Sequence, residues 1–227
     1  MSITSPFPQA ALGRLDVRDL ACRRGGPLVF AGLSFTVEPG GAVLLRGPNG
    51  SGKSTLLRCL AGLLRPEAGA ITWNDRPIGE DPEAHRRRLR YLGHQEAVKP
   101  QLGVAENLAF GTALAGAAKA DIDAGLRAFG IDRLADLPAR YLSAGQRRRL
   151  ALARVAAVPA PLWLLDEPLS GLDDAAIGLL EATIARHRAA GGMLVLSAHG
   201  AFDLPDAGTL DLARFAPARA QFADGAI

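Results

Sequence analysis

Residues 47–55 carry the strongest structural signal in the chain and read Gly47-Pro48-Asn49-Gly50-Ser51-Gly52-Lys53-Ser54-Thr55. They match the phosphate-binding pattern GxxxxGK followed by Ser or Thr, and they lie between a strand-like run, Ala42 to Arg46, and a helix-like run, Lys53 to Leu63. Glycines let the backbone curl so that successive N–H groups converge on phosphate oxygens, at a helix N-terminus whose dipole favours negative charge. The pattern therefore predicts that the chain binds a nucleoside triphosphate.

Two side chains of this loop have expected roles. Lys53 is expected to reach the β- and γ-phosphates, and the hydroxyl of Ser54 is expected to bind Mg²⁺. A glycine-rich turn without a ligand is the alternative for the loop taken alone. The loop also leaves kinases, GTPases, helicases and transport ATPases open, so the rest of the chain has to separate these classes.

A second motif is a short apolar run, residues 162–165, that ends in the adjacent carboxylates Asp166 and Glu167. Such a run is typical of a buried parallel strand, and ligands of open α/β sheets bind at the carboxyl edge of the strands. Asp166 is placed to support the Mg²⁺ shell, and Glu167 is placed to act as general base on the attacking water. Two solvated acids at the start of a loop are the alternative, and Pro168 fits a loop.

A third motif lies just upstream of that strand. It consists of Leu142-Ser143-Ala144-Gly145-Gln146, and a basic, alanine-rich segment follows at residues 147–154. Ser143 is a good N-cap for a helix, and its hydroxyl together with the free N–H groups of Ala144 and Gly145 makes a second anion site. An ordinary amphipathic helix start would explain Ser143 alone.

This third motif resembles the signature of the ATP-binding cassette (ABC) family, which usually reads LSGGQ. The resemblance implies an α/β phosphate-loop NTPase fold, an ABC ATPase cassette with a β-rich N-terminal subdomain and an inserted helical subdomain. It also implies a homodimer in which the Ser143 turn of one copy closes on the γ-phosphate held by the other. Ala144 stands where most relatives have glycine; if that position needs a positive φ, its Cβ costs on the order of 1 kcal/mol.

Three weaker matches follow in the order that the family requires. The resemblance gives Gln95 a contact with Mg²⁺ and the attacking water, and it lets Asp173, in Ser170-Gly171-Leu172-Asp173, cross the dimer interface. It makes His199, after the β-rich run Met193 to Ser197, the residue that hydrogen-bonds the γ-phosphate. The catalytic set predicted from sequence is therefore Lys53, Gln95, Glu167 and His199, with Ser54, Gln95 and Asp166 around Mg²⁺.

The family's adenine-stacking aromatic residue has no counterpart in residues 21–26. The best alignment puts Arg24 at that position, with Arg23 nearly as good, and a planar guanidinium can stack on a base. We therefore count Arg24 among the predicted ATP-binding residues.

The remaining histidines and the two cysteines suggest no further site. We expect His85 and His187 at the surface, and we assign no role to His94. Cys22 and Cys59 are expected in the core or a loop of a protein from a reducing compartment, because a metal site needs more ligands than these.

Length and composition agree with one catalytic domain of 227 residues and 23.7 kDa, 48% of them hydrophobic. We expect a single ABC ATPase domain over 1–227: a nucleotide-binding core at about 15–95 and 141–202, a helical subdomain at about 96–140 and a C-terminal tail at 203–227. In the helical subdomain the pattern predicts helices from Val104 to Phe110 and from Lys119 to Phe129. The tail has one predicted edge strand, near Thr209 to Leu212.

The formal net charge of +3 and the sequence pI of about 9.2 do not indicate a nucleic-acid partner. The basic clusters at residues 86–90 and 147–149 lack interleaved aromatic residues, and a solvated helix face or a surface near anionic lipid explains them. The first residues lack the layout of a secretory signal. No apolar run approaches the roughly 20 residues that span a bilayer, so we expect membrane attachment through other chains.

Further phrases resemble one ABC subfamily, the ATP-binding subunit of the bacterial haem exporter of cytochrome c maturation (the CcmA family). They are Gly32-Leu33-Ser34-Phe35, residues 60–66, Tyr91-Leu92-Gly93-His94-Gln95, Glu106-Asn107-Leu108, residues 141–146 and residues 161–168. The discriminating features are Ala144 and the triplet Gly93-His94-Gln95.

This resemblance implies an ATP- and Mg²⁺-dependent ATPase, peripheral on the cytoplasmic face of the bacterial inner membrane. Its partners would be CcmB- and CcmC-like integral-membrane permease subunits, and the helical subdomain would receive a coupling helix from them. No direct haem contact is expected, because the cassette does not touch cargo. An ATPase subunit of another ABC exporter, with drug, lipid or metal cargo, stays open. So does a soluble ABC ATPase of DNA repair or translation, although such proteins usually have a coiled-coil insertion or two cassettes.

Overall fold

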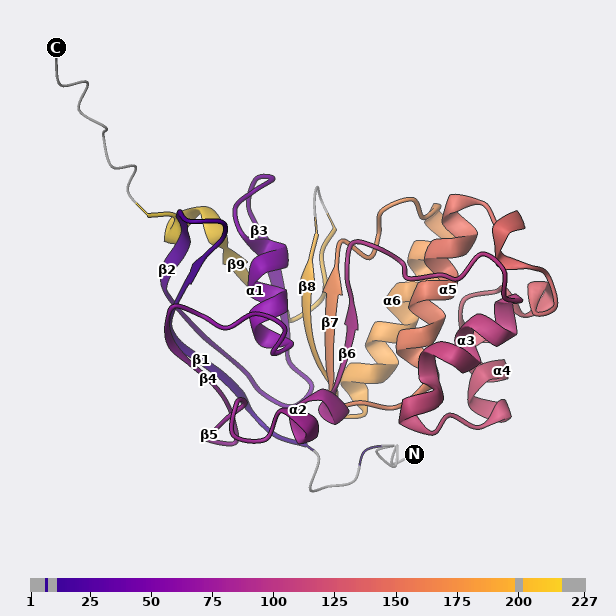
Figure 1. Ribbon diagram of the computed structural model, residues 1–227, viewed down its shortest axis with the longest axis horizontal. Coiled ribbons are helices and arrows are strands. Elements are labelled where there is room, and N and C mark those ends of the chain that lie inside the picture. Colours follow the sequence, from indigo (N-terminus) through magenta and orange to yellow (C-terminus); the bar gives the residue numbers. More distant parts are fainter. Residues whose placement is uncertain (1–6, 8–11, 199–201, 218–227) are drawn as a thin grey trace, which may run out of the picture.

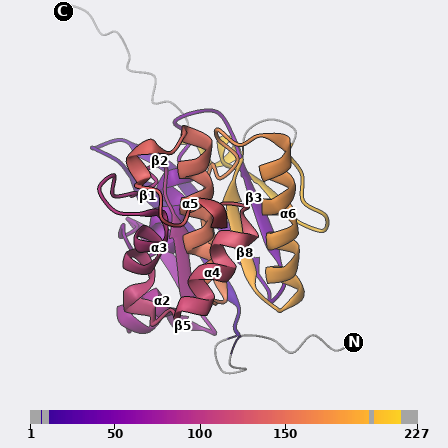
Figure 2. The same cartoon turned by 90° about the vertical axis from the view of Figure 1, so that its right-hand side faces the viewer.

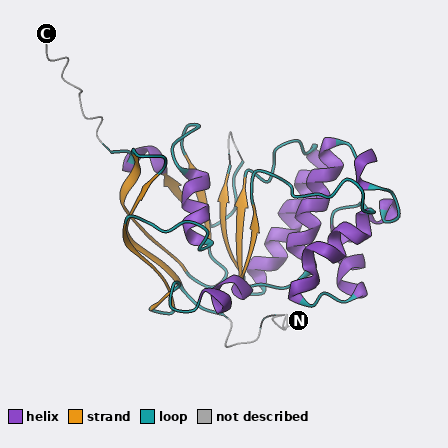
Figure 3. Cartoon of the chain, in the orientation of Figure 1, coloured by secondary structure: helices purple, strands orange, loops and turns teal. Residues whose placement is uncertain are grey.

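The computed structural model describes residues 7, 12–198 and 202–217. Over these residues the chain forms two sheets and a group of helices (Figure 1; Figure 3). A four-stranded antiparallel sheet has the order β2-β1-β4-β5, and a five-stranded parallel sheet has the order β6-β7-β8-β3-β9. The strands are β1 (Leu15–Arg23), β2 (Leu28–Val37), β3 (Ala42–Arg46), β4 (Ala68–Trp73), β5 (Arg76–Pro77), β6 (Leu89–Leu92), β7 (Leu162–Asp166), β8 (Met193–Ser197) and β9 (Gly208–Asp211).

The helices flank the parallel sheet on both faces (Figure 1; Figure 2). The α-helices are α1 (Lys53–Leu60), α2 (Pro82–Arg88), α3 (Val104–Thr112), α4 (Lys119–Ala128), α5 (Ala144–Ala157) and α6 (Asp174–Ala189). Short 3₁₀ turns are η2 (Ala113–Ala115), η3 (Asp132–Leu134), η4 (Ala139–Tyr141) and η5 (Leu212–Phe215). None of the helices in the described part of the chain is long and apolar enough to cross a membrane.

The central strands are buried on both faces, which explains their unbroken apolar sequence. In β7, Leu162 and Leu164 pack with α1 and the antiparallel sheet, whereas Trp163 and Leu165 pack with α5 and the helices beyond it. Strand β8 divides in the same way along its length. Two hydrophobic cores therefore lie against one sheet, as expected for parallel strands with covered faces. The parallel register brings the carboxyl ends of β3, β6, β7 and β8 to one edge.

The strands predicted at Ala42–Arg46 and Met193–Ser197 are confirmed, and the predicted tail strand is β9, which pairs with β3 at the sheet edge. The two helices predicted after residue 103 are α3 and α4, with ends within two residues of the prediction. The helix predicted to run to Leu63 is wrong at its end. It stops at Leu60, because Gly62 at φ +68° turns the chain.

The surface positions predicted for His85 and His187 are wrong. His85 is only 1% exposed, and its Nε2 lies 2.8 Å from the carbonyl oxygen of Leu60, at the end of α1. His187 is 7% exposed and stacks on the Trp163 ring, with centroids 3.9 Å apart. Burial lowers the pKa of both rings, to about 4 for His187. In each histidine the Nε2 atom bonds to a backbone carbonyl inside the protein, of Leu60 for His85 and of Met193 for His187, and sequence alone does not display this contact.

The basic clusters are only partly solvated faces. Arg148 is 3% exposed and bonds to backbone carbonyl groups, and Arg90 is half-buried beside α5. For Arg148 and Arg90, the interpretation of the basic clusters as a solvated helix face is therefore wrong.

Candidate nucleotide-binding site

The loop between β3 and α1 has the curled backbone that its glycines allow. Gly47, Gly50 and Gly52 have φ values of +129°, +81° and +101°. A Cβ on Gly47 would lie 2.7 Å from Ser51 Oγ, and one on Gly52 would lie 2.6 Å from Val29 Cγ1. Larger residues would therefore be strained and would also collide with their neighbours. The loop leads directly into the N-terminus of α1, where backbone N–H groups have no partner within the helix.

Polar groups of the loop fit a phosphate ligand. Lys53 is 5% exposed, and its Nζ donates to the carbonyl oxygens of Gly47 at 2.7 Å and Pro48 at 3.1 Å. The buried Oγ of Ser51 has no hydrogen-bond partner among the residues that the structure describes. A buried ammonium held by two neutral carbonyl groups, next to an unsatisfied hydroxyl, gains from negatively charged oxygen atoms.

The two carboxylates at the end of β7 are held by the neighbouring strand. Asp166 is 2% exposed, and its Oδ1 accepts a hydrogen bond of 2.7 Å from Ser197 Oγ. The same Oγ accepts a 2.8 Å hydrogen bond from the backbone N–H of Glu167. This arrangement follows from the parallel register, which pairs Asp166 with Ser197. Glu167 has a φ of +48°, so the chain turns sharply at the residue predicted to be the base.

One small cavity of about 70 Å³ brings several of the predicted residues together. Its lining consists of Arg24, Asn49, Gly50, Gly52, Lys53, Ser54, Thr55 and Glu167. Arg24 is therefore near the loop, whereas the Nη1 of Arg23 donates to the carbonyl of Gly26 at 3.0 Å within its own turn. This geometry favours Arg24 over Arg23 as the residue predicted to stack on the nucleotide base.

Of the predicted catalytic and Mg²⁺-binding residues that the structure describes, Asp166 and Gln95 do not line this cavity. Gln95 is exposed and follows β6, whose Leu92 pairs with Leu165, so it belongs to the same edge of the sheet. His199 follows β8 but lies outside the described residues. Within the described part of the chain, no group of three or more His, Cys, Asp or Glu side chains could hold a metal ion. Mg²⁺ sites of nucleotide enzymes need few protein ligands, because substrate phosphates and water supply the rest.

The predicted N-cap at Ser143 is confirmed. Its Oγ accepts from the N–H of Gln146 at 3.2 Å, and the Gln146 side chain accepts from the N–H of Ser143 at 2.8 Å. Ala144 is the first residue of α5 and is not among the residues with positive φ, so the strain considered for its Cβ does not arise. A Cβ on Gly145 would lie 2.9 Å from the carbonyl oxygen of Gly171, which places the start of α5 against the loop before α6.

Asp173, predicted to act across an interface, is the N-cap of α6. Its Oδ1 accepts from the N–H of Ala176 at 2.8 Å. The phosphate loop and the start of α5 lie on opposite sides of strands β6 to β8 (Figure 1). Within one chain the two anion sites are thus separate.

Sequence reasoning missed two residues of this region. Ser197 was considered only as the end of a strand, although a polar residue closing an apolar run at a ligand edge is a usable signal. Arg148 was assigned to a basic cluster, yet it shares a helical stripe with the buried Leu152 and Val155. An arginine on an apolar stripe indicates a buried guanidinium with backbone or acidic partners.

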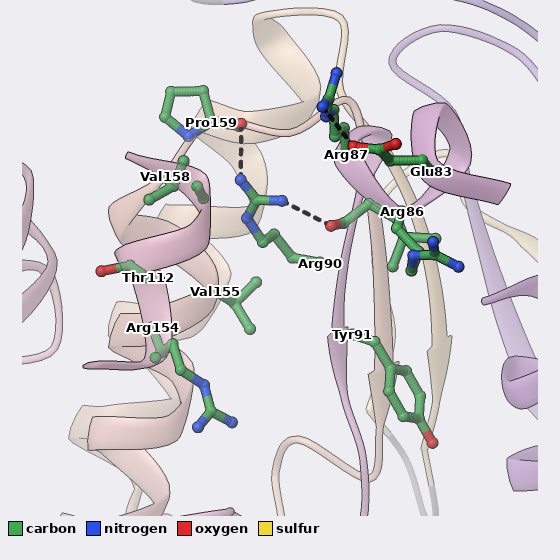
Figure 4. Close-up of a pocket in the computed structure, with 13 residues that line it drawn as sticks. Glu83, Arg86, Arg87, Arg90, Tyr91, Thr112, Arg154, Val155, Val158 and Pro159 are labelled. Atoms are coloured by element: carbon green, nitrogen blue, oxygen red, sulfur yellow. Dashed lines mark hydrogen bonds and ion pairs between the residues drawn. The ribbon is translucent and has the colours of Figure 1, made fainter. Parts of the chain in front are cut away.

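A larger cavity of about 830 Å³ lies between α2, β6 and the ends of α3 and α5 (Figure 4). Its lining is basic, with Arg86, Arg87, Arg90 and Arg154. Arg87 pairs with Glu83 at 2.6 Å, and burial lowers the pKa of Arg90 and Arg154. The cavity is well removed from the phosphate loop along the sheet and is a separate surface.

Known proteins resemble this chain over most of its length. A family model described as ABC transporter matches residues 30–170. The cytochrome c biogenesis ATP-binding export protein CcmA of Rhodospirillum rubrum is 58% identical over 199 residues, covering 88% of this chain and 85% of that protein. The CcmA protein of Paramagnetospirillum magneticum is 56% identical over 207 residues, covering 89% and 95%.

A solved structure of an ABC transporter ATP-binding protein from Pyrococcus furiosus superimposes with a TM-score of 0.79 at 26% identity, covering 89% of this chain and 99% of that one. The two chains therefore share one fold over the 89% of this chain that superimposes. The chain belongs to the ABC transporter family and, within it, to the CcmA cytochrome c biogenesis ATP-binding export proteins, with the α/β phosphate-loop cassette fold that the sequence predicted.

Proposed function

We propose that this chain is the ATP-hydrolysing subunit of a transporter complex that serves the maturation of c-type cytochromes. The observation that carries the ATPase proposal is the cavity shared by Lys53, Ser54 and Glu167, which joins a phosphate-binding loop to a candidate base. The two CcmA relatives, at 58% and 56% identity, are cytochrome c biogenesis ATP-binding export proteins, which supports the same role for this chain.

The phosphate loop binds the triphosphate through its backbone N–H groups and Lys53. The ammonium exchanges its carbonyl partners for phosphate oxygens and stabilises the charge that develops on them during hydrolysis. Arg24 lines the same cavity and stacks on the base. Mg²⁺, when bound, neutralises phosphate charge, and Ser54, Gln95 and Asp166 are the residues that would hold it.

Glu167 acts as the general base that takes a proton from the attacking water. Its backbone turn is fixed by Ser197, so the carboxylate starts from one defined direction. His199 orients the γ-phosphate, in line with its place after β8.

A second copy of the chain completes each site. The exposed Ser143 turn, at the N-terminus of α5, offers N–H groups and a hydroxyl to the γ-phosphate bound by the other copy. The separation of the two anion sites within one chain supports this head-to-tail arrangement, in which two ATP molecules lie between two protomers. Asp173 contacts the partner near the same interface.

Membrane subunits of the CcmB and CcmC type dock on the chain, which is peripheral on the cytoplasmic face of the inner membrane. The basic cavity in Figure 4 supports a docking site for an acidic helix of such a subunit, because its lining holds four arginines and a single glutamate. Phe110, at the end of α3, is 62% exposed and adds an apolar contact beside it.

Two experiments test the proposal at its two levels. The variant Glu167→Gln should bind ATP but hydrolyse it very slowly, so stable nucleotide-bound dimers should appear in light scattering; unchanged turnover would refute the base assignment. Deletion of the gene in its host should remove haem-stained c-type cytochromes while b-type cytochromes persist. Normal c-type levels would discard the cytochrome role and leave the ATPase proposal standing.

A further inference from the structure

Arg148 is a buried cation whose hydrogen bonds all go to one backbone turn. The side chain projects from α5 and is 3% exposed. Its Nε donates to the carbonyl oxygen of Pro168 at 3.2 Å, and its Nη2 donates to those of Asp166 at 2.9 Å and Glu167 at 2.5 Å. Three consecutive carbonyl groups, at the point where β7 ends, thus accept from one planar guanidinium.

The burial of this charge needs a reason beyond packing. Burial lowers the pKa of Arg148, and the charges of Glu96, Asp166 and Glu167 act in the opposite direction. A buried ion is expensive, and an apolar side chain of similar volume often stabilises a fold as well or better. The geometry instead indicates that the three carbonyl groups must be held in fixed directions, because only arginine presents several donors in a fixed plane.

The backbone turn to which Arg148 donates its hydrogen bonds contains Glu167 and orients its side chain. Glu167 has a φ of +48°, a conformation that a residue with a Cβ adopts only when its surroundings impose it. Ser197 in β8 holds the N–H side of this turn, and Arg148 in α5 holds the carbonyl side. Both contacts restrain the backbone from which the carboxylate of Glu167 projects.

The N-terminus of the same helix carries the partner-facing turn. Ser143 caps α5 five residues before Arg148, which is about 7.5 Å along a helix axis. The first turn of α5 also packs closely on the loop before α6, since a Cβ on Gly145 would meet the carbonyl of Gly171 at 2.9 Å. A shift of α5 when Ser143 engages nucleotide would therefore be transmitted to the turn of Glu167.

We propose that Arg148 is a positioning residue for ATP hydrolysis: it fastens the backbone of the catalytic Glu167 to the helix whose N-terminus contacts the partner's nucleotide. This inference rests on the proposed function. When the Ser143 turn closes on the nucleotide bound by the partner, Arg148 transmits this movement to Glu167, the general base of the chain's own site. Hydrolysis at the two sites of a dimer is therefore coupled. Arg148 itself touches no substrate.

The test compares Arg148→Lys and Arg148→Met with the control Arg149→Lys, in the complex purified through a tag on this chain. Arg149 is the next residue of α5, and its Nη1 reaches only the carbonyl of Phe129 at 3.5 Å. Lysine keeps the charge, but its three N–H donors diverge from a single nitrogen and do not reproduce the planar fork of the guanidinium. We expect kcat to fall at least about tenfold in both Arg148 variants, with Lys retaining more activity than Met, while the Kd for ATP changes by less than about twofold.

Two results would overturn the proposal. One is a wild-type kcat in Arg148→Lys; the other is a parallel loss of kcat and ATP affinity, which a merely structural role would give. A second measurement does not depend on hydrolysis: amide hydrogen exchange in residues 166–172 should accelerate in Arg148→Lys and not in Arg149→Lys, and equal exchange would also overturn it. A wild-type complex without ATPase activity would instead contradict the proposed function, and the exchange result would still decide the role of Arg148.

Discussion

The hydroxyl of Ser197 holds both Asp166 and Glu167, so its removal is predicted to lower both the stability of the protein and its ATPase activity. Ser197 is fully buried. Its Oγ donates to Asp166 Oδ1 at 2.7 Å and accepts from the N–H of Glu167 at 2.8 Å. The substitution Ser197→Ala removes one oxygen atom, creates no clash, and leaves a carboxylate oxygen and a backbone N–H without this partner.

The magnitude follows from these two contacts. A hydrogen bond to a charged group contributes about 1.5–3 kcal/mol, and an unsatisfied buried N–H costs about 1–3 kcal/mol. The vacated space is about one atom in size and too small for a replacing water. Allowing for the fact that the two losses share one atom, we expect the free energy of unfolding to fall by about 3 kcal/mol. The turnover number should also fall, because the turn of Glu167 loses the hydrogen bond that holds its N–H.

Urea unfolding followed by circular dichroism measures the stability, and phosphate release measures turnover. Thr72→Val is the matched control, because Thr72 Oγ1 is a buried hydroxyl without a partner; its removal should change stability by less than about 0.5 kcal/mol. A loss below about 1 kcal/mol in Ser197→Ala, or an equal loss in both variants, would refute the reasoning that the hydroxyl holds the carboxylate turn.

Three further predictions concern the helices and the core. Ala144→Gly should destabilise by up to about 1 kcal/mol in urea unfolding and give no gain in ATPase rate, because Ala144 is helical; a faster enzyme would contradict this. Burial lowers the pKa of His187 from 6.5 to about 4, so the unfolded state takes up the proton first as pH falls. Stability present above pH 6.5 should therefore decline by about 3 kcal/mol towards pH 4, and His187→Gln should flatten that part of the curve measured by urea titration. Burial raises the pKa of the Cys59 thiol, and its Sγ lies 3.7 Å from that of Cys22, which is also buried. A thiol reagent at pH 8 should therefore label neither residue until the protein unfolds. Rapid labelling of the native protein would contradict this prediction.

The sequence predicted the parts of this structure that depend on local backbone demands. The phosphate loop requires glycines at Gly47 and Gly52, the cap requires a hydroxyl at Ser143, and a strand covered on both faces requires an apolar run before Asp166. Each of these requirements is met by residues that are close together in the sequence. For this reason the loop, the N-cap and the central strands were placed correctly.

The features that were missed depend on partners distant in sequence. His85 and His187 are buried because backbone carbonyl groups of other segments, at Leu60 and Met193, need a ring nitrogen. In the sequence, Arg148 does not differ from the other arginines of its basic run. Only the fold places three carbonyl groups at the end of β7 within hydrogen-bond distance of its guanidinium. These hydrogen bonds join residues that are 6 to 25 positions apart, and no periodicity in a single sequence encodes them.

The central claim is that each hydrolytic site combines the phosphate loop of one chain with the Ser143 turn of another. Mixing two inactive variants, Lys53→Ala and Ser143→Arg, tests it directly. A mixed dimer holds one site with both an intact Lys53 and an intact Ser143, so ATPase activity should reappear on mixing, at up to about a quarter of the wild-type rate for random pairing in a two-fold dimer. If both elements had to come from the same chain, every site in the mixture would lack one of them, and no activity would return.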